Sequence, residues 1–369
     1  MRILYVTTIG ITMGFFNSFI RELLDDGHVV DIATNESVNN CIPDCYREWG
    51  CKVYQISTSR SPFSKGNLKA IKQLKMLVEK EKYDIVHCHT PVAAMCTRFA
   101  CRKARKKGTK VFYTAHGFHF YKGAPLKNWV LYYPIEKLCA YFTDVLITIN
   151  QEDYVLAKEK MQAQKVVYVP GVGIDLSKFG KIIIDKETKR REIEVPIDTI
   201  LMLSIGELNE NKNHETVIRA IADIENVYYI IAGEGELREH LQNVINELGI
   251  ADRTKLLGYR NDIGELCEVA DIYAMPSYRE GLSVALMEAM ASGLPCIVSR
   301  IRGNTDLIDE NGGVLFEPHS INECVLSLQN LLKEDLNILG KNNSKKIEKF
   351  SLLVVNLTMK KLYEEGING

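Results

Sequence analysis

The stretch DIYAMPSYREGLSVALMEAMASGLPCIVS, residues 271–299, decides the fold of this chain. It holds two short apolar runs, DIYAMPS (271–277) and PCIVS (295–299), whose length is typical of buried strands. Between them, residues 282–292 carry the pattern of a helix. A strand, a helix and a second strand in this order predict two parallel strands joined by a crossover helix.

The same alternation extends over most of the chain. Further strands are predicted at 199–206, 227–235 and 255–258, with helices near 213–224, 236–249 and 261–269. A separate set lies in the first half, with strands at 3–8, 29–34, 84–89, 110–115 and 144–149 and a helix at 66–81. Two such sets predict an α/β protein with two Rossmann-like domains that face each other across a cleft.

Composition places the domain boundaries and limits the class of protein. We expect domains at 1–175 and 176–345, with a polar linker at 178–198. The tail 344–369 is expected to be helical, and the segment 346–369 is expected to form a C-terminal helix that returns to the first domain. The 369 residues are 46% hydrophobic and 25% charged, as in ordinary soluble proteins. No apolar run reaches the ~18 residues of a membrane-spanning helix, and MRILYVTTIGI at the start is expected to be a buried strand and not a signal peptide.

Metal binding is not expected. The ten cysteines follow no regular framework, and the only cluster, at Cys41, Cys45 and Cys51, lacks a fourth ligand at finger-like spacing. No Asp-x-Asp pair is present to hold a divalent ion on a nucleotide.

Charge is distributed unevenly along the chain. Residues 1–170 hold 24 Lys and Arg against 15 Asp and Glu, a net charge of +9, and residues 171–369 have a net charge of −10. The basic half contains CRKARKKGTK (101–110) and FHFYKGAPLKNWVLYYP (118–134), where aromatic residues alternate with lysines. This pattern suits an anionic membrane surface or single-stranded nucleic acid, but a core-packed aromatic segment beside a solvated helix end explains it equally well.

The stretch that decides the fold also carries two glutamates. Glu280 precedes the predicted helix and Glu288 lies eight residues later, about 12 Å along a helix. The free amides of Gly281, Leu282 and Ser283 would favour a phosphate at the helix start. A bound diphosphate would then place a sugar beside Glu280 and a ribose beside Glu288, although two surface glutamates remain the simpler alternative.

Three loops offer further candidates. Lys212, in SIGELNENKNHETVIRAI (204–221), would neutralise a departing diphosphate, or it is a solvated lysine. His116, in YTAHGFHFYKGAP (113–125), is a general base, a sugar contact or a structural histidine. The loop from Gly10 to Gly14 follows the first strand but lacks the full dinucleotide fingerprint.

Taken together, these segments resemble family 4 of the retaining glycosyltransferases, which have the GT-B fold. EGLSVALME (280–288) is similar to the family's Glu-x7-Glu signature, and GELNENKN (206–213) to its phosphate-lysine loop. The blocks at 232–238, 257–263 and 292–308 follow in the family's order. AHGFH (115–119) and the YYPIEK string resemble the capsule and exopolysaccharide branch, whose members extend lipid-diphosphate-linked sugars on the cytoplasmic face of bacterial membranes.

The resemblance implies a role for each candidate. Glu280 would hold the donor sugar, Glu288 the ribose, and Lys212 with the amides near Ser283 the diphosphate. His116 would contact the sugar near the reaction centre, and Gly14 would let its loop approach the phosphates. Tyr259 and Arg260 would lie by the base. In one departure, Glu207 stands where many relatives carry arginine, so that one phosphate contact is lost or supplied elsewhere.

We therefore expect a peripheral, cytoplasmic retaining glycosyltransferase. Its donor would be a UDP-sugar carrying a hexose or N-acetylhexosamine, its acceptor a lipid-diphosphate-linked saccharide, and its first domain would meet an anionic membrane; no cofactor, metal or nucleic acid is expected. Two alternatives use the same fold: a non-catalytic sugar-nucleotide-binding subunit of a polysaccharide assembly complex, and a UDP-sugar epimerase.

Overall fold

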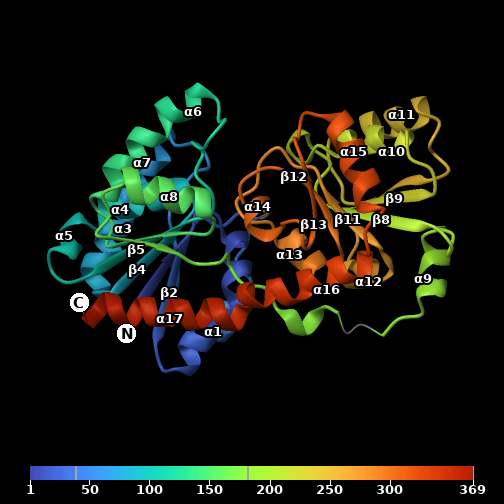
Figure 1. Cartoon of the computed structure of the whole chain (residues 1–369). Helices are drawn as coiled ribbons and strands as arrows, with labels where there is room; N and C mark the ends of the chain where they lie inside the picture. Colours follow the sequence, from blue (N-terminus) through green and yellow to red (C-terminus); the bar gives the residue numbers. More distant parts are fainter. Residues whose placement is uncertain (38–39, 181–182, 369) are drawn as a thin grey trace. The chain divides into compact units, whose positions relative to one another are not determined.

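The computed structural model of the chain describes residues 1–37, 40–180 and 183–368 (Figure 1). It divides into two compact units: unit 1 comprises Met1–Gly173 with Leu352–Gly369, and unit 2 comprises Ile174–Ser351. The chain thus changes unit at 173/174 and 351/352, a few residues from the boundaries expected from the sequence.

Unit 1 is built on a seven-stranded parallel sheet of order β3-β2-β1-β4-β5-β6-β7. Its strands are β1 (Arg2–Val6), β2 (Val29–Thr34), β3 (Val53–Gln55), β4 (Ile85–His89), β5 (Lys110–Ala115), β6 (Val145–Thr148) and β7 (Lys165–Tyr168). Its helices are η1 (Gly10–Phe16), α1 (Asn17–Asp25), α2 (Cys45–Glu48), α3 (Gly66–Glu81), α4 (Pro91–Ala100), α5 (Arg102–Arg105), α6 (Leu126–Leu131), α7 (Tyr133–Ala140), α8 (Gln151–Lys160) and α17 (Leu352–Asn368).

Unit 2 is built on a six-stranded parallel sheet of order β10-β9-β8-β11-β12-β13. Its strands are β8 (Ile200–Ile205), β9 (Val227–Ala232), β10 (Thr254–Gly258), β11 (Ile272–Met275), β12 (Cys296–Ser299) and β13 (Gly313–Phe316). Its helices are η2 (Leu176–Lys178), α9 (Lys186–Glu192), η3 (Glu210–Lys212), α10 (His214–Ala222), α11 (Arg238–Glu247), α12 (Ile263–Val269), α13 (Val284–Ala291), α14 (Asn304–Leu307), α15 (Ile321–Leu331), α16 (Leu336–Ile347) and η4 (Glu348–Phe350).

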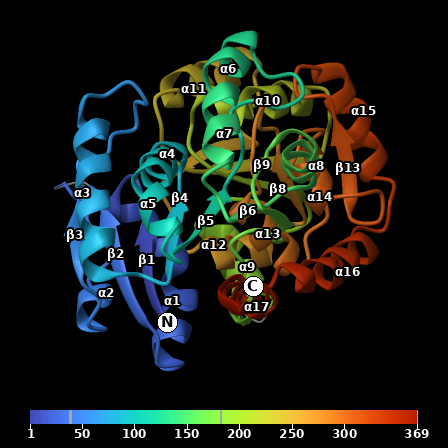
Figure 2. The same ribbon diagram turned by 90° about the vertical axis from the view of Figure 1, so that its left-hand side faces the viewer.

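Each sheet has a hydrophobic core on both faces, because side chains alternate along a strand. In unit 1, Leu4 faces the core under α3 and α4, whereas Tyr5 faces the core under α1 and α17. In unit 2, Leu203 faces α12, α13 and α16, whereas Met202 faces α10, α11 and α15. Helices on both faces of each parallel sheet confirm the two predicted Rossmann-like domains (Figures 1 and 2). Helix α17 belongs to unit 1, which confirms that the C-terminal helix returns to the first domain.

Two expectations about elements are wrong. The stretch 178–198 is not a free linker: it contains α9, and Ile193 and Val195 belong to the core of unit 2, while residues 181 and 182 lie outside the described residues. The tail 344–369 is not one helix, since the chain leaves α16 and passes through η4 before α17 begins. Three edge strands, β3, β7 and β13, also went unpredicted, because an edge strand needs no long apolar run.

Candidate functional site

In unit 2, the loop after β8 places Lys212. The side chain of Asn209 caps η3 by accepting the amide N–H of Lys212 at 3.0 Å. The aliphatic part of Lys212 then lies over Gly206, where an added Cβ would be only 3.2 Å from the lysine Cε. A glycine at this position lets the lysine side chain cross the end of the strand.

Lys212 forms an ion pair with Glu280. Its Nζ lies 2.8 Å from Glu280 Oε1, and the two side chains are 21% and 14% exposed. Arg302 Nε donates to the main-chain oxygen of Glu280 at 3.2 Å and so holds the backbone of this residue. The ion pair joins the loops that follow β8 and β11, which are neighbours in the sheet. The structure therefore brings together two residues that are 68 positions apart in the sequence.

The helix after Glu280 begins two residues later than the sequence predicts. Ser283 is the N-cap of α13, and its side chain accepts the N–H of Leu286. Gly281 and Leu282 therefore lie in the loop and not in the helix, because the extended backbone of Ser283 delays the first helical turn. Within the described part of the chain, no acceptor takes the amide N–H of Gly281, Leu282 or Ser283. These amides are available to an anion.

Glu288 lies on the same helix, α13. Its carboxylate makes no hydrogen bond or ion pair with any described residue, although the side chain is mostly covered. Burial raises the pKa of Glu288, and the nearby charge of Lys178 only partly opposes this effect. A half-buried carboxylate with unused acceptor capacity suits the hydroxyl groups of a ribose.

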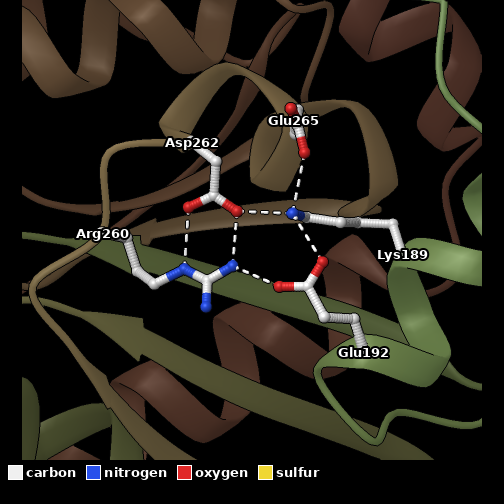
Figure 3. A network of polar contacts seen from close by, with 5 residues as sticks. All are labelled: Lys189, Glu192, Arg260, Asp262 and Glu265. Carbon is white, nitrogen blue, oxygen red and sulfur yellow. Dashed lines mark hydrogen bonds and ion pairs between the residues drawn. The ribbon is translucent and has the colours of Figure 1, made fainter.

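The predicted base-binding residues Tyr259 and Arg260 differ in their surroundings. Tyr259 follows β10 and is 72% exposed. Arg260 is already engaged, since its guanidinium donates to Asp262 and lies 2.7 Å from Glu192 (Figure 3). Asp262 in turn contacts Lys189 at 2.5 Å. The guanidinium thus serves to join α9 to the loop after β10, a role that the sequence did not predict.

Unit 1 carries the other two predicted residues. His116 follows β5, and its Nε2 lies 3.1 Å from Nδ1 of His89 at the end of β4. Burial lowers the pKa of His116 to about 4, so that its ring is neutral at physiological pH. Gly14 lies in η1, exposed, and an added Cβ there would meet no atom of a described residue within 4 Å. The space around Gly14 leaves room for a ligand to approach the backbone.

One feature of unit 1 was not predicted, and a second agrees with an alternative that the sequence left open. His87 and His89 share one face of β4, which the alternating string HCH could have revealed. The aromatic residues of 118–134 pack mainly on one another: Phe120 contacts Phe118, Trp129 and Tyr133. The exposed apolar side chains of this segment are instead aliphatic, with Leu126 78% and Val130 64% exposed.

Across residues 1–37, 40–180 and 183–368, no three His, Cys, Asp or Glu side chains are grouped so as to hold a metal ion. A search of the same residues finds no helix with the length and apolarity needed to cross a bilayer.

Comparison with known proteins agrees with this geometry. Residues 2–150 match the family Glycosyl transferase 4-like, and residues 185–350 match Glycosyl transferases group 1. The chain is 40% identical over 267 residues to EpsD of Bacillus subtilis (strain 168), named as a candidate glycosyltransferase, covering 70% of each protein. It is 32% identical over 292 residues to the UDP-Gal:alpha-D-GlcNAc-diphosphoundecaprenol alpha-1,3-galactosyltransferase of Escherichia coli, covering 76% of this chain and 75% of that protein.

Solved structures share the whole architecture. HepE of Anabaena in complex with UDP superposes with a TM-score of 0.81 at 19% identity, covering 99% of this chain and 100% of HepE. Sucrose-phosphate synthase from Thermosynechococcus elongatus has a TM-score of 0.79 at 20% identity, with 99% and 98% of the two chains covered. With both sheets, the loop signatures and these relatives in agreement, the chain is a glycosyltransferase that belongs to family 4 and has the GT-B fold.

Proposed function

We propose that this glycosyltransferase moves a hexose or N-acetylhexosamine from a UDP-sugar to a lipid-diphosphate-linked saccharide, with retention at the anomeric carbon. The acceptor would be an intermediate of a surface polysaccharide. The reaction would take place at the inner face of the cell membrane.

One observation carries the donor half of this proposal: the contact between Lys212 and Glu280, beside the amides of Gly281, Leu282 and Ser283, for which no described residue is an acceptor. The ammonium group and the amides would stabilise the negative charge that grows on the leaving diphosphate. Glu280 would accept hydrogen bonds from sugar hydroxyls, and the carboxylate of Glu288 would accept them from the ribose.

The relatives support the choice of donor and acceptor. The name of the E. coli protein states a UDP-galactose donor and a GlcNAc-diphosphoundecaprenol acceptor. Solved complexes of HepE contain UDP and UDP-glucose. Retention needs no enzymic nucleophile if the leaving phosphate takes the proton of the acceptor hydroxyl on the same face of the sugar.

The test is transfer from a panel of UDP-sugars to undecaprenyl-diphosphate-linked GlcNAc, for the wild type and for Lys212→Ala and Glu280→Ala. Each substitution should lower kcat by about 10²–10³-fold, the usual effect of losing one group that stabilises developing charge. NMR of the product should show the anomeric configuration of the donor.

Lys255→Ala is the matched control, because this lysine also forms an ion pair in unit 2, with Glu194 at 2.5 Å. It should transfer at the wild-type rate. Transfer unaffected by both site substitutions would reject the proposal. A product formed from UDP-sugar in the absence of acceptor, with a changed sugar configuration, would instead identify an epimerase.

A further inference from the structure

Three histidines lie in a row at the carboxyl ends of two neighbouring strands of unit 1. His87 and His89 point to the same face of β4, and His89 pairs in register with Thr114 of β5, two residues before His116. The ring centroids of His87 and His89 are 4.1 Å apart, and those of His89 and His116 are 5.4 Å apart. Figure 2 shows β4 and β5 side by side.

Packing fixes the ring of His89. It stacks on Tyr5, with centroids 5.3 Å apart and planes inclined by 17°, and its centroid lies 4.2 Å from that of the Phe16 ring. Behind it, His87 is held between Thr114 Oγ1 at 2.8 Å and the hydroxyl of Tyr363 on α17 at 2.5 Å. His89 is only 2% exposed, so that its ring cannot turn without displacing these neighbours.

All three rings are neutral near pH 7. Burial lowers the pKa of His87 to about 3 and of His116 to about 4, and it holds the pKa of His89 well below the usual value. A neutral imidazole has one N–H and one acceptor nitrogen. In the 3.1 Å contact between His89 Nδ1 and His116 Nε2, one ring therefore donates and the other accepts.

The far nitrogen of His89 decides which ring donates. Its Nε2 is sealed from solvent and has no hydrogen-bond partner among the described residues. If His116 were the donor, the proton of His89 would have to sit on this nitrogen, as a buried N–H without an acceptor. Buried donors without acceptors are rarer than under-used acceptors. The favoured arrangement has the proton of His89 on Nδ1, where it is used.

We infer that His89 is a positioning residue that donates Nδ1–H to His116 Nε2 and thereby keeps the proton of His116 on Nδ1. No hydrogen bond to Nδ1 of His116 is found within the described part of the chain. His116 then meets its ligand as a hydrogen-bond donor, to a hydroxyl or phosphate oxygen of the nucleotide sugar, and not as a general base. The identity of the ligand of His116 rests on the proposed function, whereas the tautomer of His116 is a property of the protein alone.

The tautomer can be observed directly. In protein labelled with ¹⁵N at histidine, long-range ¹H–¹⁵N spectra distinguish protonated from unprotonated ring nitrogens, and His116→Asn would assign the signals. We expect His116 in the wild type to be protonated at Nδ1. Finding the proton on Nε2 would overturn the inference, whatever the enzyme transfers.

Two variants of His89 separate positioning from simple structural support. His89→Phe keeps the stacking on Tyr5 but removes the donor, so His116 should lose its single tautomer and kcat/KM should fall on the order of tenfold. His89→Asn supplies an amide N–H close to the position of Nδ1–H and should recover most of the loss and the wild-type tautomer. Equal loss in both variants, with melting temperatures unchanged, would contradict the inference.

Failure of this inference differs from failure of the proposed function. If Lys212→Ala and Glu280→Ala left transfer intact, the proposed donor site would be wrong, while the ¹⁵N spectrum of His116 would still report its tautomer.

Discussion

Glu207 begins the loop that carries Lys212, and its exposed carboxylate accepts a hydrogen bond from Asn209 Nδ2 at 3.0 Å. A negative charge here opposes the binding of a diphosphate at Lys212. We predict that Glu207→Arg tightens the binding of UDP by up to about fivefold, because one favourable charge contact near a protein surface contributes up to about 1 kcal/mol. Isothermal titration calorimetry at fixed salt measures this change.

Glu210→Arg is the matched control, because it lies in the same loop, is also exposed, and changes the net charge equally. It should improve affinity less. If the two variants bound UDP equally well, the effect would come from overall charge and not from a local contact.

Sequence spacing pointed to most residues of the candidate donor site, because these residues follow strand ends. Lys212 and Glu280 end neighbouring loops of one parallel sheet, and such loops lie at one edge. The exact start of α13 was missed, since Leu282 is compatible with a helix until Ser283 is seen to cap it. The engagement of Arg260 was also missed, because its partner Glu192 lies 68 residues away.

Among the elements, α9 is held to unit 2 by charge. Lys189 is nearly buried, and burial disfavours its charged form, yet contacts with Asp262, Glu265 and Glu192 at 2.5, 2.7 and 2.9 Å outweigh this and raise its pKa (Figure 3). We predict that Lys189→Met lowers the free energy of unfolding by about 1–3 kcal/mol, less than for a fully buried pair because two of the carboxylates are half exposed.

Urea denaturation followed by circular dichroism measures this loss. Arg191→Met removes a mainly exposed charge from the same helix, paired with Glu187, and should change stability by less than about 0.5 kcal/mol. Equal effects would mean that the network in Figure 3 does not hold α9 in place.

Helix α6 presents two exposed aliphatic side chains of unit 1. Leu126 and Val130 lie one turn apart, with Lys122 and Lys127 exposed beside them. We predict that this surface binds anionic membranes: Leu126→Ser with Val130→Ser should weaken binding to phosphatidylglycerol vesicles about tenfold. Added salt should weaken the binding of the wild type.

Leu357→Ser is the control, since Leu357 is 57% exposed on α17 of the same unit. Sedimentation with vesicles should separate the variants. Binding to phosphatidylcholine vesicles as strong as to anionic vesicles would exclude the contribution of the lysines.

The central strands and the helices α3, α10, α11, α12 and α13 were predicted from the sequence, whereas three edge strands and α9 were not. β3, β7 and β13 are edges, so their runs are short and partly exposed. α9 has the composition of a loop. It packs as a helix because carboxylates of unit 2 neutralise Lys189 and because Asp271 binds Arg190. Such long-range pairing has no local signature.

For the whole molecule, pH should act on unit 1 through its histidines. In the unfolded chain these groups bind a proton below about pH 6.5. In the folded unit, burial lowers the pKa of His87 to about 3 and the pKa of His116 to about 4, and it lowers the pKa of His89 well below its usual value. The unfolded state therefore holds more protons between these values. The free energy of unfolding of unit 1 should therefore be highest above pH 6.5. It should fall as the pH drops towards 4, by up to about 1.4 kcal/mol per pH unit for each histidine.

Tryptophan fluorescence can follow this loss in one unit, because Trp49 and Trp129 both belong to unit 1 and the sequence has no other tryptophan. Denaturation at pH 7.5, 6 and 5 should show decreasing midpoints, and His89→Phe should have a shallower dependence. Midpoints that stay constant over this range would refute the prediction.

The return of the chain to unit 1 has a consequence for synthesis on the ribosome. Val355, Met359 and Tyr363 of α17 fill the core beneath β1 and β4, and Tyr363 bonds His87. Unit 2 is continuous in sequence, and its ends meet, with the amide of Ile174 bonded to Phe350 O at 3.0 Å. The later-translated unit can thus fold as soon as it emerges, while the earlier one waits, with part of its interior uncovered, for residues 352–368. During that interval nascent chains would depend on chaperones to shield this surface.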